Sequence, residues 1–336
     1  MNVINQERQK LRELAHGFYF SCGLYATVRI GLADALFHEA KTPARLALEL
    51  NADADALKRL ISFMISINVF ENCDEKIKLT ESGKFLTSNH ANSLAKEISM
   101  FSGGETYQAW GNVMTSLRTG KPAFNDLYGK SLFEYFSDHK ETAERFHSGW
   151  QEITASTAKE FVQTYKFLSN DKIIDVGSGY GIFLCTIIQN NQHLSGALYD
   201  LPVSLEGAPE IVKRFGLQDK VSIIPGDASK SVPSGYTVHL LKSVIHNCTD
   251  EQSIQMLAHC ASALTKGGKV LIVERVVPAG DAYHWSKLVD MTMLVMTGGR
   301  ERTENEYIVL CNKSGLKLAK IIALPSGFSI IECHKE

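Results

Sequence analysis

The sequence lacks the features that would indicate a membrane, secreted or nucleic-acid-binding protein. No apolar run approaches the roughly 18 residues that cross a bilayer, and Met1 to Leu14 are polar and charged, without the apolar segment of a secretory signal. The 35 Lys and Arg residues are balanced by 37 Asp and Glu, whereas nucleic-acid-binding domains usually carry a basic excess. We therefore expect a cytoplasmic protein that binds neither membrane nor nucleic acid.

Cysteine shows no pattern either. The seven cysteines are scattered singly, their number is odd and no C-x-x-C occurs. Neither a disulfide framework nor a zinc site is indicated. No group of His, Asp and Glu stands at metal-ligand spacing in the sequence, so no metal is expected.

The 336 residues are enough for two domains, and the first hundred show helical periodicity followed by two short strand-like runs. Helix, turn, helix and a small hairpin is the order of a winged helix. The expected elements are a helix over Ala15–Phe37, one from Thr42 to Leu50, one from Asp53 or Asp55 to Ile67, and strands over Val69–Glu71 and Lys76–Leu79.

The sequence pattern changes after a second helical stretch, Ser102–Thr164. From Lys172 onward, short β-branched runs alternate with helical stretches, which predicts βαβ units on a parallel sheet. The last two runs, Leu318–Leu324 and Phe328–Cys333, are close enough for an antiparallel hairpin. We expect an α/β fold divided into a winged-helix-like domain (1–100), a helical linker and substrate-lid region (101–165) and a cofactor-binding catalytic domain (166–336).

A glycine-rich turn follows the first strand of this α/β region. The run Ile173–Gly181 ends a buried strand in G-x-G-x-G, with Asp175 two residues ahead of Gly177, and Gly179 next in the motif. Such turns let the backbone approach a ligand at the carboxyl end of a strand. A dinucleotide fingerprint would need a further glycine where Ile182 stands, so the spacing favours an adenosyl ligand without a pyrophosphate.

Two acids end the next two strands. Asp200 follows Gly181 by 19 residues, where a carboxylate can accept both ribose hydroxyls, and Gly226-Asp227-Ala228 ends the third strand, where it can meet an adenine ring. Each Asp has an alternative role as a helix cap.

His246 lies beyond the fourth strand, and its ordinary pKa near 6.5 suits general-base work at neutral pH. Glu274 ends the fifth strand and Glu301 follows Gly298-Gly299-Arg300. Either carboxylate can hold the imidazole Nδ1–H and leave Nε2 as the base. Alternatively, Glu274 pairs with Arg275 or Lys287, and Glu301 is a first-turn acid of the helix that starts near Thr303.

At these residues the chain resembles the two-domain small-molecule O-methyltransferases, which include the plant caffeate type, hydroxyindole O-methyltransferase and bacterial enzymes acting on phenazines and anthracyclines. The resemblance covers nearly the whole chain. The matching motifs are the Asp175–Gly181 loop, Tyr199-Asp200-Leu201-Pro202, Gly226-Asp227, Leu241-Lys242 through His246, and Gly299-Arg300-Glu301-Arg302-Thr303.

The resemblance implies a Rossmann-like methyltransferase sheet with an antiparallel last strand, and an N-terminal dimerisation domain that builds a homodimer. It implies S-adenosylmethionine (SAM) as the cofactor and His246 as the base, flanked by Glu274 and Glu301. The cofactor-binding set is Asp175, Gly177, Gly179, Asp200, Leu201, Gly226, Asp227, Ala228 and Lys242.

The expected reaction is methylation of a hydroxyl on a small aromatic molecule. Phe146, Trp150, Met291 and Met293 would suit a flat apolar acceptor, although each is equally suited to an ordinary core. The family commonly has H-D-W where this chain has His246-Asn247-Cys248. The loss of an acid beside the base is expected to alter the pKa of His246 or its packing. Two alternatives stay open: a SAM-binding relative with N-methylation or non-methylating chemistry, and a winged-helix regulator that senses a metabolite.

Overall fold

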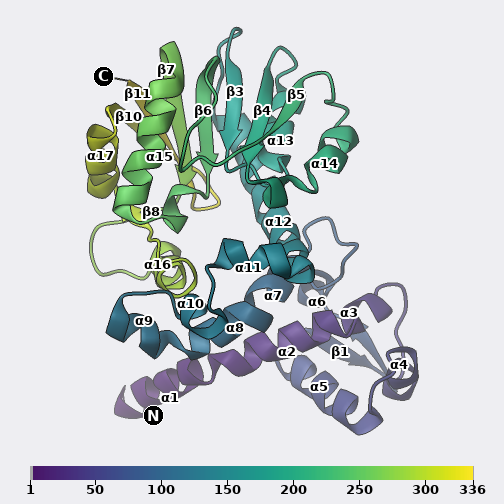
Figure 1. Ribbon diagram of the computed structural model, residues 1–336. Helices are drawn as coiled ribbons and strands as arrows, with labels where there is room; N and C mark the ends of the chain where they lie inside the picture. Colours follow the sequence, from purple (N-terminus) through teal and green to yellow (C-terminus); the bar gives the residue numbers. More distant parts are fainter. Residues whose placement is uncertain (1–2, 336) are drawn as a thin grey trace. The chain divides into compact units, whose positions relative to one another are not determined.

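The computed structural model describes residues 3–335, which fall into two compact units (Figure 1). One unit comprises Met1–Gln108 and Glu144–Glu152, and the other comprises Ala109–Ala143 and Ile153–Glu336. The domain boundaries expected from the sequence, 1–100, 101–165 and 166–336, stay a prediction. No helix within residues 3–335 is both long and apolar enough to span a bilayer.

The first unit is helical with one small hairpin, in the helix–helix–hairpin order expected of a winged helix. Its core includes Leu32, Leu46, Met64 and Phe70, each at most 1% exposed. The elements are α1 (Val3–Ala15), α2 (Gly17–Arg29), α3 (Leu32–Ala35), α4 (Pro43–Glu49), α5 (Ala54–Ser66), β1 (Phe70–Cys73), β2 (Lys76–Leu79), α6 (Glu81–Lys84), α7 (Ala95–Phe101) and α8 (Gly104–Gly111, whose end from Ala109 belongs to the second unit).

Local capping decides where these helices begin and end. The Thr42 hydroxyl accepts from Arg45 N at the start of α4. Asp53 rather than Asp55 caps α5, accepting from Ala56 N at 2.8 Å. The continuous helix expected over Ala15–Phe37 is wrong, because Gly31 adopts φ +78° between α2 and α3, a left-handed conformation that ends a helix.

The second unit begins with helices and continues as an α/β domain. The first elements are α9 (Val113–Thr119), α10 (Ala123–Tyr128), α11 (Leu132–Asp138), the long α12 (Lys140–Thr164, whose middle belongs to the first unit), β3 (Lys172–Val176), α13 (Ile182–Asn190), β4 (Ser195–Asp200), η1 (Pro202–Leu205), α14 (Ala208–Arg214), β5 (Val221–Pro225) and β6 (Tyr236–Lys242). They are followed by η2 (Ile245–Asn247), α15 (Asp250–Ala263), β7 (Leu264–Glu274), β8 (Val276–Val277), α16 (Trp285–Met296), β9 (Arg302–Thr303), α17 (Glu304–Lys313), β10 (Leu316–Ala323) and β11 (Ser329–Lys335).

The main sheet has the order β10-β11-β7-β6-β3-β4-β5. Strands β3 to β7 pair in parallel, whereas β11 pairs antiparallel with both β7 and β10. The expected hairpin at the end of the chain and the expected parallel sheet are therefore confirmed.

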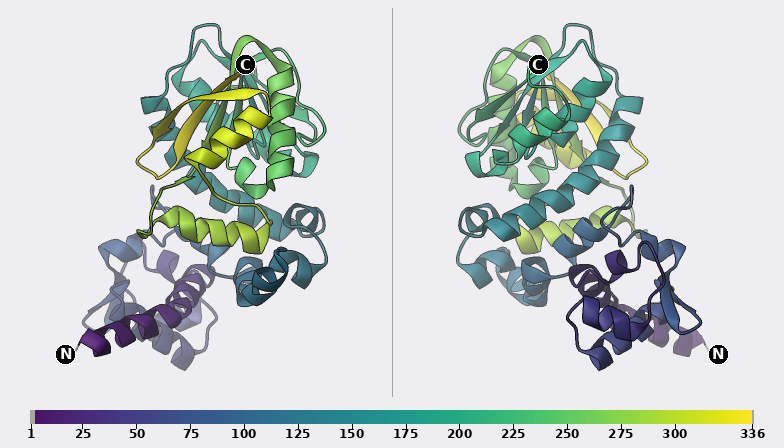
Figure 2. Two further views of the ribbon diagram at one scale, coloured as in Figure 1. Left: turned by 90° about the vertical axis from the view of Figure 1, so that its left-hand side faces the viewer. Right: turned by 90° about the vertical axis from the view of Figure 1, so that its right-hand side faces the viewer.

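Helices cover both faces of this sheet (Figure 2). Neighbouring residues of a strand point to opposite faces, and accordingly Ile173 packs in one apolar cluster and Ile174 in the other. Residues of α12, α13 and α14 belong to the first cluster, and residues of α15 and α17 to the second. The middle of the sheet is thus a rigid, buried platform whose carboxyl edge carries the polar groups described next.

Candidate active site

The candidate site residues gather at one edge of the sheet. Gly177 follows β3, Asp200 ends β4, Gly226 follows β5, Lys242 ends β6 and Glu274 ends β7. These strands are parallel, so their carboxyl ends meet at the edge where open α/β sheets bind ligands.

The glycine turn after β3 lies against the chain that leaves β6. Gly177 has φ +75°, and a Cβ there would stand 2.5 Å from Val244 Cγ2. Any side chain at this position would therefore clash as well as strain the backbone. The turn leads into α13 at Ile182.

Asp200 is held at the end of β4 by neighbouring backbone groups. One carboxylate oxygen accepts from Gly179 N at 2.8 Å and the other from Leu201 N at 2.7 Å. Burial raises the pKa of Asp200, although these hydrogen bonds oppose that shift. The carboxylate thus ties the glycine turn to the end of β4 and does not cap a helix.

Asp227, the acid that follows β5, is held by a neighbouring serine. Asp227 accepts from Ser229 N and Ser229 Oγ at 3.0 and 2.6 Å. The carbonyl oxygen of the next residue, Ala228, lies 3.1 Å from His259 Nδ1. Gly226 N donates to the Asp200 carbonyl at 2.9 Å, so the second and third strand ends are linked.

Asp175 and Lys242 are buried ionisable groups near this edge. Within residues 3–335, Asp175 Oδ2 has no hydrogen-bond partner, and burial, with Asp200 nearby, raises the Asp175 pKa to about 7. Lys242 Nζ donates to Thr154 Oγ1 at 2.9 Å, and burial lowers the Lys242 pKa to about 7. An unsatisfied buried carboxylate oxygen is costly, and a ligand with N–H or O–H donors fits it.

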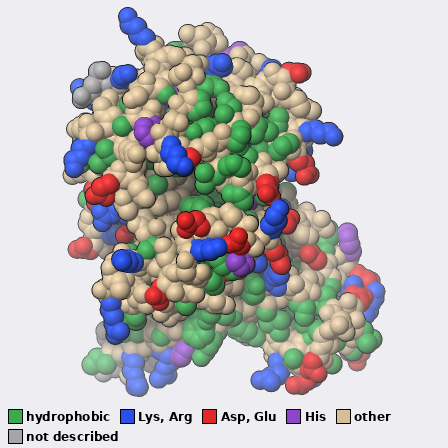
Figure 3. All heavy atoms as spheres, viewed as in Figure 1, with side chains coloured by type: hydrophobic (Ala, Val, Ile, Leu, Met, Phe, Trp, Pro, Cys, Tyr) green, Lys and Arg blue, Asp and Glu red, His purple; other side chains and the backbone are tan. Residues whose placement is uncertain are grey.

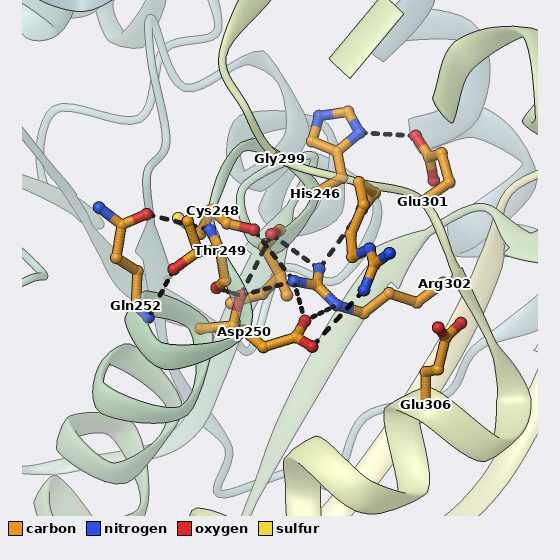
Figure 4. Close-up of polar contacts among 12 residues, drawn as sticks. His246, Cys248, Thr249, Asp250, Gln252, Gly299, Glu301, Arg302 and Glu306 are labelled. Atoms are coloured by element: carbon orange, nitrogen blue, oxygen red, sulfur yellow. Dashed lines mark hydrogen bonds and ion pairs between the residues drawn. The ribbon is translucent and has the colours of Figure 1, made fainter. Parts of the chain in front are cut away.

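His246 is brought together with both predicted carboxylates. Its Nδ1 lies 2.8 Å from Glu301 Oε1 (Figure 4) and 3.5 Å from Glu274 Oε2. The other oxygen of Glu274 accepts from Val244 N at 2.8 Å and from His246 N at 3.4 Å. All three side chains are buried.

The two carboxylates control the charge of the imidazole. Burial alone lowers the pKa of His246, but Glu274 and Glu301 outweigh it, so the pKa is raised above 6.5. The three residues also form a set whose ligand atoms lie within 4.8 Å of one another, close enough to hold a cation. The sequence predicted these three residues as a base and its candidate carboxylate partners, but they lie too far apart in the chain to show metal-ligand spacing.

The four residues expected to contact the acceptor are divided between the units. Phe146 and Trp150 belong to the first unit, with ring centroids 6.2 Å apart. Met291 and Met293 belong to α16 in the second unit, and Met293 is buried. Their joint contact with an acceptor stays a prediction.

The structure gives contacts to Asp290, which the sequence interpretation did not single out, and to Asn247, which it noted only as a departure from the family motif. Asp290 Oδ1 accepts from Glu301 N at 2.9 Å. Asn247 Nδ2 donates to the Ser243 carbonyl at 3.0 Å, a bond that an ionised Asp, which only accepts, could not make. The departure from H-D-W was the available signal for Asn247, whereas nothing local marked Asp290.

Comparison with known proteins shows the class of enzyme. The model of the O-methyltransferase domain matches residues 110–317, and that of the O-methyltransferase dimerisation domain matches residues 12–91. The chain belongs to the O-methyltransferase family.

Its relatives match over most of their length. Phenazine O-methyltransferase PhzM of Lysobacter antibioticus is 32% identical, over 96% of this chain and 95% of the relative. The 3-amino-4-hydroxybenzoate 4-O-methyltransferase of Streptomyces cremeus is 34% identical, over 94% of this chain and 87% of the relative. The structure of CalO1, a methyltransferase in calicheamicin biosynthesis solved in its SAH-bound form, is 30% identical, covers both chains fully (100% each) and has a TM-score of 0.82.

These similarities confirm the family, the fold class and the enzyme class expected from the sequence. They also confirm SAM as the cofactor of this enzyme class. The roles of individual residues in this chain are a separate matter and are proposed below.

Proposed function

We propose that this enzyme methylates a hydroxyl group of a small aromatic molecule, with His246 as the general base. The observation that carries the proposal is the 2.8 Å contact between His246 Nδ1 and Glu301, at the sheet edge that also carries Asp200. The relatives named above act on a phenazine and on a hydroxybenzoate, both aromatic, which supports the acceptor class.

Cofactor binding falls to the ends of β3, β4, β5 and β6. Bound SAM supplies an activated methyl group. Asp200 is proposed to accept the ribose hydroxyls, and the glycine turn around Gly177 and Gly179 is proposed to contact the rest of the molecule. Asp175, with its unpartnered oxygen, and Lys242 complete the polar surroundings. Leu201, Gly226, Asp227 and Ala228 are proposed to contact the ribose and the adenine.

The base works because one nitrogen of the ring is already engaged. With Nδ1–H donating to Glu301, Nε2 is the unprotonated nitrogen that accepts the hydroxyl proton. A phenol has a pKa near 10, so keeping it ionised at pH 7 costs roughly 4 kcal/mol, from three pKa units at about 1.4 kcal/mol each. Proton removal by His246 during attack avoids that cost, and Glu274 and Glu301 stabilise the resulting imidazolium.

We also propose a homodimer built by the first unit, in the cytoplasm. The dimerisation-domain match covers residues 12–91. The helices α1 and α2 expose Leu11, Leu14, Phe18, Tyr19 and Phe20, each between 42% and 68%, and Figure 3 shows hydrophobic side chains at the surface of this unit. Apolar surface of this extent usually marks an interface.

The test is incubation with methyl-labelled SAM and a panel of planar phenols, hydroxyphenazines and matched aromatic amines. We expect methyl ethers. Product from the amines alone would identify a nitrogen acceptor, and SAM binding without any methylated product would indicate other chemistry. Calorimetry that finds no SAM affinity would refute the proposal altogether.

A chelator separates the base from a cation at the same three residues. We expect activity to survive chelation, because proton transfer to His246 needs no metal. Activity that is lost and then restored by a divalent cation would replace the base with a metal centre.

A further inference from the structure

The segment Gly299–Arg302 packs directly on the turn that carries His246, which comprises η2 and the residues that follow it. A Cβ at Gly299 would stand 2.0 Å from the His246 carbonyl oxygen, so only glycine permits this approach. Arg300 N donates to the same carbonyl at 2.8 Å. Glu301, the next residue, holds the imidazole of His246. One short segment therefore contacts both the backbone and the ring of the proposed base.

Arg302 completes this contact with a fully buried guanidinium (Figure 4). Its nitrogens donate to the carbonyls of Ile245 and Cys248, both at 3.0 Å, which lie on either side of His246. Nε and Nη2 also donate to Asp250 Oδ1 at 3.0 and 2.9 Å. A guanidinium presents its donors in a fixed plane, so these bonds fix the backbone conformation of the turn as well as pairing the charge of Asp250.

The turn needs such support because its backbone is strained at its start. Ser243 adopts φ +56°, in the left-handed region, which non-glycine residues occupy at a cost. Its carbonyl is held by Asn247 Nδ2. The chain between β6 and α15 is therefore held at Ser243, at His246 and at Asp250. Arg302 contacts it on either side of His246 and at Asp250.

We propose that the Arg302–Asp250 pair is a positioning device that holds the His246 turn so that the ring meets Glu301 and presents Nε2 to the acceptor. This inference rests on the proposed role of His246 as base. Neither Arg302 nor Asp250 contacts the reacting groups. They act through the backbone of the turn, and a displacement of the base by about 1 Å is enough to slow a reaction about 10²-fold.

Asp250 is the residue to change, because its side chain is 46% exposed whereas Arg302 is buried. Asp250→Asn keeps an oxygen for Arg302 but removes the charge, and Asp250→Ala removes both. The neighbouring acid of the same helix turn, Glu251, is exposed, and Glu251→Gln is the matched control.

We expect Asp250→Ala to lower kcat about 10- to 100-fold, with Asp250→Asn in between and Glu251→Gln unchanged. The Kd for SAM should change less than about twofold in all three, because Asp200 ends β4 and Asp227 follows β5, whereas Asp250 begins α15. The acid limb of the kcat–pH profile should also move to lower pH in Asp250→Ala, because a displaced ring gains less from Glu301 while Glu274 and Arg275 stay nearby.

The outcomes separate this inference from the function on which it rests. If Asp250→Ala matches Glu251→Gln in kcat and pH profile while His246→Ala is impaired, the positioning role is wrong. If Asp250→Ala weakens SAM binding as much as it lowers kcat, the pair merely supports the fold and the inference is also overturned. If His246→Ala itself is fully active, the proposed base fails first, and any loss in Asp250→Ala then has another cause.

Discussion

Replacement of His246 by alanine should slow methylation of an ordinary phenol about 10²- to 10⁴-fold, the usual effect of a positioned acid–base group. The size can be worked out from the acceptor. At pH 7 about one phenol molecule in 10³ with a pKa near 10 is ionised, so an enzyme without its base depends on that fraction. For an acceptor with a pKa near 7, about half is ionised, and the loss should shrink to a few-fold.

The structure also predicts a side effect of this substitution. Alanine leaves Glu274 and Glu301 buried without the ring between them. Removing one partner from such a buried group typically destabilises a protein by about 3–5 kcal/mol. His246→Gln is the better variant for kinetics, because its amide keeps a donor for a carboxylate but cannot act as a base at neutral pH.

The assay is a single-turnover measurement of methyl transfer with phenols of graded pKa, after thermal unfolding has shown that the variant is folded. The Kd for SAM should stay near that of the wild type, because the proposed cofactor contacts lie on Gly177, Asp200 and Asp227. A variant that methylates a phenol of pKa 10 at the wild-type rate would show that His246 is structural. A loss that is the same for every acceptor would equally refute proton removal as its role.

Three further predictions concern the cofactor site, the carboxylate partner of His246 and the dimer. Asp200→Ala should remove two hydrogen bonds to ribose, worth about 1.5–3 kcal/mol each, and so raise the Kd for SAM by about 10²-fold or more; calorimetry that finds an unchanged Kd would contradict the ribose assignment. Glu301→Gln should lower the pKa of His246, which burial lowers and the two carboxylates raise above 6.5, so the acid limb of kcat should move to lower pH. The sign for stability follows: the contribution of the His246 pair to the free energy of unfolding is full below about pH 6.5 and is lost as pH rises through the raised pKa, and pH-dependent melting should show a smaller such loss in Glu301→Gln. Sedimentation at micromolar concentration should show a dimer, and Leu14→Glu should shift it toward monomer while the exposed control Glu7→Gln does not; a wild-type monomer would refute the dimer.

The sequence alone determined the features that depend on neighbouring residues. Alternation of β-branched runs with helical stretches located the strands of the sheet, and β3 (Lys172–Val176) has the expected bounds. The glycine turn and Asp200 were recognisable because a strand followed by a fixed spacing places them at one edge. The antiparallel hairpin at the end of the chain followed from the short connection between β10 and β11.

Some local choices were not open to sequence reasoning. Asp53 and Asp55 are both good helix caps, and only the fold shows that Asp53 accepts from Ala56 N. The periodicity of Ala15–Phe37 continued through Gly31, and the break appears only where packing sets φ to +78°. A glycine permits such a turn but does not require it.

The site itself was decided by the tertiary structure. Glu274 and Glu301 stood as candidate partners of His246 with plausible alternatives, since 28 and 55 residues separate them from it. The buried guanidinium of Arg302 belonged to a recognised motif, yet its bonds to Ile245, Cys248 and Asp250 span about fifty residues of sequence. Periodicity and spacing report interactions along a strand or a helix, whereas contacts across the sheet edge exist only after the layers have packed and excluded water.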